Sequence, residues 1–203
     1  MRLDKLSKKQ KILILVLVLV VVFAVLDFGY FSANFAYIFH GGKTVYRDPA
    51  AADYPSAKKM QPNTLVVDSL GITAPIVYIT ENNEKAYQAG LVNGVVHYPG
   101  TAEPGQLGNC YIFGHSSDYV FSKGHYKTVF AVLPQIKLGA EITASDRQGN
   151  AFTYIVTDSH VVAANDVSVL DQQGNTKKLI TLQTSYPIGT ALKRWVVVGE
   201  LKE

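Results

Sequence analysis

The sequence of 203 residues is 48% hydrophobic and 17% charged, which excludes a disordered chain and leaves room for one domain and an appendage. The formal net charge is +3, yet residues 1–11 carry five basic side chains and one aspartate. The rest of the chain therefore totals −1, the overall +3 less +4, and offers no positive surface for nucleic acid. A single cysteine, Cys110, excludes an internal disulfide and a cysteine-based metal site.

An apolar segment follows the basic arm. Residues 12–26 form an unbroken apolar run of fifteen residues, which as a helix would be about 22 Å long, short of a ~30 Å hydrocarbon core. Phe28, Tyr30 and Phe31 extend the run beyond Asp27, so we predict a transmembrane helix over residues 12–31. Because basic flanks stay on the cytoplasmic side, residues 1–11 are predicted to be a cytoplasmic arm. A cleaved signal peptide is the alternative, but no small-residue cleavage site follows the run.

The next segment has no hydrophobic periodicity. Residues 40–63 are rich in Gly, Ala, Pro, Ser and Lys, a composition typical of linkers. We therefore predict a stalk over residues 32–63 and a folded domain over residues 64–203.

Short β-branched and aromatic runs dominate that domain. They lie at 65–67, 72–79, 95–97, 110–113, 141–144, 151–157, 179–182 and 195–198. Pro75 predicts an edge strand or a bulge for the second run, and the turn DRQGN predicts a hairpin between the fifth and sixth. One short helix is predicted over residues 84–89, after Asn82 and Asn83 and before Gly90. Seven or eight strands of this length predict an all-β sandwich or barrel.

The last two strands bring polar residues together. The segment KLITLQTSYPIGTALKRWVVVGEL, residues 178–201, has Pro187 and Gly189 between two β-branched runs, which predicts strand, loop, strand. Thr184 and Ser185 end the first strand and Arg194 begins the second. A hydroxyl and a fixed cation at facing strand ends can hold a carbonyl and its developing negative charge, although a loop serine and a surface arginine are the ordinary alternatives.

His115 is the histidine most suited to chemistry. It follows an apolar strand and a glycine in YIFGHSSD, and imidazole transfers protons near neutral pH; from position alone, a lone histidine is more often structural. Cys110 lies five residues earlier, an odd separation that predicts the opposite strand face and buried packing. His97, His125 and His160 are read as structural, and no spacing of His, Asp and Glu indicates a metal site.

Three ordered blocks resemble the sortase family over most of residues 64–201. LVVDSLGITAPIV is similar to that family's first two strands, and GVVHYPGTAEPGQLGNCYIFGHSSD to the stretch ending in its catalytic histidine, here His115. TLQTSYPIGTALKRWVVVGEL resembles the T-L-x-T-C-x-P-x-G-T signature and the following active-site arginine, here Arg194. The resemblance implies a closed, mainly antiparallel β-barrel of seven to eight strands with one or two short helices, displayed outside a bacterial membrane by one N-terminal helix.

The resemblance also implies an activity. In sortases a cysteine attacks the threonine carbonyl of an LPxTG-like sorting signal, and an amine of a peptidoglycan precursor or a pilin lysine resolves the thioester. His115 would protonate the leaving amine, Arg194 would steady the oxyanion or the peptide, and Thr184 would contact substrate. The partners are thus a sorting-signal peptide, an acceptor amine and the membrane, with no cofactor.

The nucleophile position departs from the family, because this chain has Ser185 where sortases have cysteine. A serine hydroxyl needs a hydrogen-bonded base to become a useful nucleophile. Three explanations stay open: an engineered block, a natural peptide-binding pseudoenzyme, or a working serine whose His115 is oriented by Asp118. We predict a sortase-like transpeptidase inactivated by Ser185. A membrane-tethered peptide-binding module is the alternative, and a structural partner in a surface assembly is a third hypothesis.

Overall fold

The computed structural model describes residues 7–26, 35, 60–118, 122–172 and 176–202. Helix α1 (Lys8–Leu26) contains the first part of the span predicted over residues 12–31. Residues 27–31, and the predicted stalk from 36 to 59, lie outside the described residues. Among the residues that are described, no helix combines the length and the apolar character that crossing a membrane requires.

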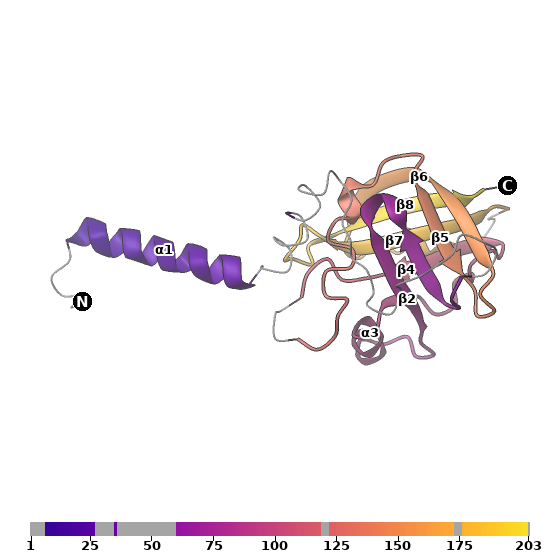
Figure 1. Ribbon diagram of the computed structural model, residues 1–203, viewed down its shortest axis with the longest axis horizontal. Helices are drawn as coiled ribbons and strands as arrows, with labels where there is room; N and C mark the ends of the chain where they lie inside the picture. Colours follow the sequence, from indigo (N-terminus) through magenta and orange to yellow (C-terminus); the bar gives the residue numbers. More distant parts are fainter. Residues whose placement is uncertain (1–6, 27–34, 36–59, 119–121, 173–175, 203) are drawn as a thin grey trace.

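Eight strands form a closed barrel (Figure 1). They are β1 (Thr64–Val67), β2 (Ile72–Tyr78), β3 (Val95–His97), β4 (Gly108–Phe113), β5 (Glu141–Ser145), β6 (Ala151–Ala163), β7 (Lys178–Tyr186) and β8 (Lys193–Leu201). Around the barrel the order is β1-β2-β3-β4-β7-β8-β6-β5, with β5 pairing back to β1. The pairs β2–β3 and β4–β7 are parallel and the others antiparallel. The prediction of a mainly antiparallel barrel is confirmed, and the sandwich is excluded.

The predicted short helix is α3 (Glu84–Leu91), which lies outside the barrel beside β2 (Figure 1). It begins where the sequence predicts, because the Asn83 side chain accepts a hydrogen bond from the Ala86 backbone N–H. It continues through Gly90, where a Cβ atom would lie 2.7 Å from Val96 Cγ2. The missing side chain therefore lets α3 pack closely on β3. The described residues also form three 3₁₀ turns: η2 (Asp68–Leu70), η3 (Leu133–Gln135) and η4 (Ser168–Leu170).

Alternate side chains along each strand point into the core and toward the outer surface. On β7, the side chains of Ile180, Leu182 and Thr184 are fully buried, whereas Gln183 and Ser185 are half-buried. Successive side chains of a strand point to opposite faces, so Gln183 and Ser185 face outward. Cys110 belongs to the core and is 0% exposed, which confirms its predicted packing role.

Pro75 does not mark an edge strand. It pairs with Thr64 of β1, and the next residue, Ile76, pairs with Val95 of β3. Strand β2 thus changes partner at the proline, and the closed barrel has no edge for it to occupy. The edge prediction is wrong because strand closure cannot be read from one run of residues.

The barrel also includes the end of the predicted linker. The backbone N–H groups of Met60 and Asn63 donate to Gly149 and Asp146 in the β5–β6 turn. The Ser145 hydroxyl donates to the Gln61 carbonyl at 2.6 Å. Residues 60–63 are therefore bound to the barrel, slightly ahead of the boundary predicted at residue 64.

Candidate active site

The β7–β8 hairpin places Ser185 directly opposite Arg194. The two residues are paired in the antiparallel register, with Gln183 and Val196 paired one strand repeat away. The Arg194 guanidinium donates through Nη1 to the carbonyls of Ala191 at 2.9 Å and Lys193 at 3.0 Å. Its own loop therefore fixes the cation beside Ser185, as the sequence predicted for this hairpin.

His115 is held beside the same hairpin by the parallel pairing of β4 and β7. Just after β4, the Gly114 N–H donates to the Gln183 carbonyl at 3.0 Å. The Phe130 N–H donates to the His115 carbonyl at 2.9 Å. Backbone bonds on both sides of the β4 terminus thus fix where the imidazole leaves the barrel.

The Thr184 side chain points into the barrel core and does not line the groove. It is 0% exposed, and its hydroxyl donates to the Gly114 carbonyl at 2.9 Å. The strand alternation that turns Ser185 outward turns Thr184 inward. This placement corrects the predicted substrate contact, since the hydroxyl instead links β7 to the residue preceding His115.

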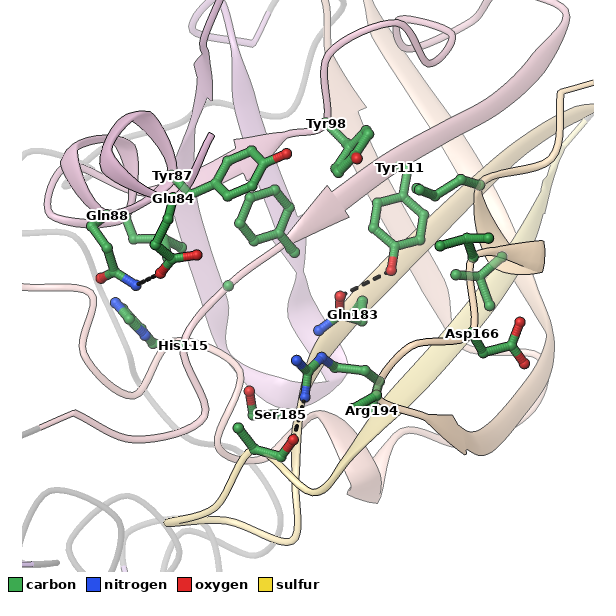
Figure 2. Close-up of a pocket in the computed structure, with 18 residues that line it drawn as sticks. Glu84, Tyr87, Gln88, Tyr98, Tyr111, His115, Asp166, Gln183, Ser185 and Arg194 are labelled. Carbon is green, nitrogen blue, oxygen red and sulfur yellow. Dashed lines mark hydrogen bonds between the residues drawn. The ribbon is translucent and has the colours of Figure 1, made fainter. Parts of the chain in front are cut away.

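A groove of about 460 Å³ brings His115, Ser185 and Arg194 together. Figure 2 shows the three side chains along its lower side, with Ser185 between the other two. Helix α3 contributes one face, at spacings of three and four residues, and β4 contributes aromatic rings. The lining residues are Glu84, Tyr87, Gln88 and Leu91 from α3 and Tyr111 and Phe113 from β4, together with Tyr98, which follows β3. Asp166, Val167, Val169 and Leu170 also line the groove.

The aromatic side chains form one connected wall. The Tyr87 and Phe113 rings meet edge to face at a centroid distance of 5.3 Å, and Tyr98 and Tyr111 do so at 5.9 Å. Such contacts stabilise a fixed arrangement of rings. The groove therefore offers a fixed aromatic surface beside the polar residues of β7.

The electrostatics of the groove favour a neutral histidine. Burial lowers the pKa of His115 below its ordinary value of 6.5, and the nearby Asp118 carboxylate offsets part of this effect. Burial also raises the pKa of Tyr111, although the Arg194 charge opposes it. At pH 7 the imidazole is thus largely unprotonated, and the Tyr111 hydroxyl keeps the proton that it donates to Gln183 Oε1 at 2.9 Å.

A serine triad does not form among the described residues. Their hydrogen bonds include none between Ser185 Oγ and the His115 ring, while Asp118 accepts one from the Ser122 hydroxyl at 2.8 Å. The same part of the chain contains no group of three His, Cys, Asp or Glu residues that could hold a metal ion. The polar chemistry of the site therefore depends on His115, Arg194 and position 185.

A further hydrogen bond connects the loop that carries His115 to the β7–β8 loop. The Gly189 N–H, in the β7–β8 loop, donates to the Ser117 hydroxyl at 3.1 Å. Ser117 lies two residues after His115, so the histidine loop and the hairpin loop are connected on the outer side of the site. The hydrogen bond limits how far either loop can move alone.

Gln183, Tyr111 and the groove face of α3 are not among the site residues predicted from the sequence. The period-two alternation of a strand already places Gln183 on the face of Ser185. The spacing of Glu84, Tyr87, Gln88 and Leu91 is that of one helix face. Neither signal shows which loop or strand lies across from it, so the groove itself was not visible.

An eight-stranded barrel with histidine, arginine and a hydroxyl along one groove defines a β-barrel protein with a polar site on its outer surface. Residues 65–202 match the family model described as the sortase domain. The chain therefore belongs to the sortase family, and the resemblance found in the sequence is confirmed. None of the curated proteins matches the chain.

Solved structures agree with this assignment. Sortase C-1 from Actinomyces oris is 27% identical, with a TM-score of 0.58, over 69% of this chain and 73% of that one. Sortase A from Corynebacterium diphtheriae, a lid mutant, is 25% identical, with a TM-score of 0.57, over 76% and 74%. A Clostridium perfringens sortase D5 transpeptidase, 24% identical, has a TM-score of 0.56 over 69% and 78%, and shows the fold alone.

Proposed function

We propose that the barrel is a sortase-type transpeptidase scaffold that binds an LPxTG-like sorting signal and presents its threonine carbonyl to position 185. One observation carries the proposal: His115, Ser185 and Arg194 line a single groove. The chain's family membership supports the same activity, and the rigid aromatic wall is suited to the apolar part of such a peptide.

The proposed chemistry requires a thiol at position 185. In a Ser185→Cys variant, the thiol proton passes to His115, the sulfur attacks the carbonyl carbon, the C–N bond breaks, and His115 gives that proton to the leaving amine. An acceptor amine then attacks the thioester, the C–S bond breaks, and the amine's proton passes to His115. Arg194 stabilises the negative charge on the carbonyl oxygen in both steps.

In the chain as written, the proposal is that acylation is blocked. A serine hydroxyl is a weak nucleophile unless a base accepts its proton, and the described hydrogen bonds provide no such base for Ser185. Peptide binding does not need the thiol, so the groove can still hold the sorting signal.

The acceptor is proposed to be a primary amine of a peptidoglycan precursor or a pilin lysine. Glu84 and Asp166 line the groove on either side of the reacting position (Figure 2). Two carboxylates attract a cationic amine, and the largely neutral His115 can take the proton that the amine must lose before attack.

We also propose that residues 12–31 anchor the domain in a bacterial membrane, with residues 1–11 cytoplasmic and the barrel outside. The fifteen apolar residues and their lysine-rich flank support this placement. The test is alkaline carbonate extraction of membranes, followed by protease treatment of intact spheroplasts. Retention with a protease-accessible barrel is expected; release by carbonate contradicts the anchor.

A second candidate function is a tethered peptide-binding module without turnover. Ser185 itself favours it, because the residue preserves the shape of the site and removes the thiol. The two candidates differ in one outcome, which is whether restoring the cysteine restores acyl transfer.

The test follows the intact mass of the full-length chain in detergent, as written and with Ser185→Cys. Both are incubated with an LPxTG-type peptide library and an amine acceptor. The transpeptidase proposal predicts an acyl adduct and a released C-terminal fragment only with Ser185→Cys. Peptide binding without an adduct in either form refutes it and supports the binding module.

A further inference from the structure

Two groove residues, Tyr111 and Gln183, have no part in the chemistry above, and their hydrogen bond gives them a distinct role. We propose that Gln183, oriented by Tyr111, is a specificity-determining residue that donates a hydrogen bond to a peptide carbonyl two residues from the scissile carbonyl. The inference rests on the proposed function, since it assumes that the groove binds an extended peptide.

The position of Gln183 on β7 sets the register. Gln183 and Ser185 are separated by one residue, Thr184, which is buried on the opposite face. One strand repeat is about 6.7 Å, and an extended peptide has the same repeat. When the scissile carbonyl lies at Ser185, a carbonyl two residues along the peptide therefore lies level with Gln183.

Tyr111 fixes which end of the Gln183 amide faces the groove. The Tyr111 hydroxyl donates to Gln183 Oε1 at 2.9 Å, and the tyrosine is only 4% exposed. Because burial raises the pKa of Tyr111, the hydroxyl remains a donor over the working pH range. The amide oxygen is thus occupied, and Nε2 is left with two N–H donors. Figure 2 shows this pair next to the Arg194 guanidinium.

The groups around the Gln183 amide favour a hydrogen-bond acceptor as the partner of Gln183 Nε2. The neighbouring Arg194 guanidinium uses Nη1 to bind its own loop, and its charge disfavours a cationic group at this point. Among the hydrogen bonds of the described residues, Gln183 Nε2 takes part in none, although Gln183 lines the groove. A peptide carbonyl satisfies that donor, and a substrate that presents no acceptor there leaves it unpaired.

The test measures peptide affinity with the full-length chain as written, which binds without turnover. The probe is the tightest-binding member of a fluorescein-labelled LPxTG-type library, followed by anisotropy. Gln183→Met, of similar length and without donors, is expected to weaken binding about tenfold, the value of one well-formed hydrogen bond. Tyr111→Phe is expected to weaken it about threefold, because the amide loses its fixed orientation.

The double variant separates a positioning role from a merely structural one. If Tyr111 acts through Gln183, adding Tyr111→Phe to Gln183→Met causes no further loss of affinity. Tyr154→Phe is the matched control for Tyr111, since Tyr154 is a fully buried tyrosine whose hydroxyl accepts the Gly105 N–H at 2.7 Å. It removes a comparable hydrogen bond outside the groove lining, and is expected to leave peptide affinity unchanged.

Several outcomes overturn the inference. Binding by Gln183→Met within twofold of the unsubstituted chain removes the proposed donor. Full additivity of the two substitutions shows that Tyr111 does not act through Gln183. Failure of the unsubstituted chain to bind any library member overturns this inference and the peptide groove together. If Gln183→Met leaves peptide affinity unchanged while Ser185→Cys still transfers the acyl group, this inference alone is overturned.

Discussion

Arg194 is held in place in the site by its own loop. Its guanidinium is fixed by two carbonyls of its own loop and its backbone pairs with Ser185. In a Ser185→Cys background, Arg194→Ala is expected to lower kcat/KM about 100-fold, because a donor aimed at developing negative charge is lost. Arg194→Lys keeps the charge but not the fork of donors. Its kcat/KM should lie between that of Arg194→Ala and that of the chain with Arg194 unchanged.

The control for this prediction is Arg147→Ala. Arg147 pairs with Glu103 at 3.0 Å and lies 4.3 Å above the Tyr78 ring, and it does not line the groove. Steady-state turnover of a sorting peptide measures all three variants. Equal losses for Arg147→Ala and Arg194→Ala would contradict a specific role for Arg194.

His115 makes the stability of the fold depend on pH. Burial lowers the pKa of both His115 and His97 below the ordinary 6.5. As the pH falls below that value, the unfolded chain binds these protons before the folded one, so the free energy of unfolding decreases. Each histidine contributes at most about 1.4 kcal/mol per pH unit. Urea unfolding between pH 7.5 and 5.5 is expected to show the decrease.

The assignment to His115 can be checked by substitution. His115→Gln is expected to reduce the dependence of unfolding free energy on pH in this interval, while His125→Gln, at an exposed position, should not. A slope unaffected by His115→Gln would show that the imidazole is not desolvated in the folded chain.

Thr184 acts where two elements meet. Its buried hydroxyl donates to the Gly114 carbonyl, so Thr184→Val is expected to leave that carbonyl unpaired and lower the free energy of unfolding by about 1–3 kcal/mol. Because Gly114 precedes His115, turnover in the Ser185→Cys background should fall as well. Thr184→Ser keeps a hydroxyl at the same place and should recover most of both.

Unfolding and turnover measured together decide between the possible roles of Thr184. A Thr184→Val variant whose free energy of unfolding, KM and kcat are all unchanged would refute the link between β7 and the histidine loop. A variant that raises KM alone would indicate the direct substrate contact that the sequence suggested.

The sequence predicts the strands themselves better than it predicts which strands contact one another. Each predicted strand is present, and the hairpin that pairs Ser185 with Arg194 follows from the turn residues Pro187 and Gly189. The inward direction of Thr184 follows from the same alternation, yet the motif suggested a substrate contact instead. The change of partner at Pro75 and the Tyr111–Gln183 hydrogen bond depend on strands distant in sequence, which local patterns cannot show.

At the scale of the whole molecule, the barrel closes through a short seam. Strands β1 and β5 share only the pairs Leu65–Ala144 and Val66–Thr143. The buried Ser145 hydroxyl reinforces the seam by accepting the Thr64 N–H at 2.8 Å and donating to the Gln61 carbonyl at 2.6 Å. Ser145→Ala is expected to lower the free energy of unfolding by about 1–3 kcal/mol, since a buried N–H loses its partner.

Hydrogen exchange locates the effect of Ser145→Ala. Faster exchange should begin in β1 and the residues before it, while β7 and β8, which pair along eight residues each, stay protected. The exposed Ser69 supplies the control, Ser69→Ala, with little change expected. Uniform loss of protection across the barrel would contradict a local seam.

Under the proposed function, the groove is a sortase site that lacks only the thiol. The most direct measurement is the rate of amine-dependent sorting-peptide cleavage by the full-length chain as written, with Ser185→Cys, and with Ser185→Cys combined with His115→Asn. Turnover only in the Ser185→Cys single variant is the predicted result. Turnover that persists after His115 is replaced, or no turnover in any form despite peptide binding, would contradict the claim.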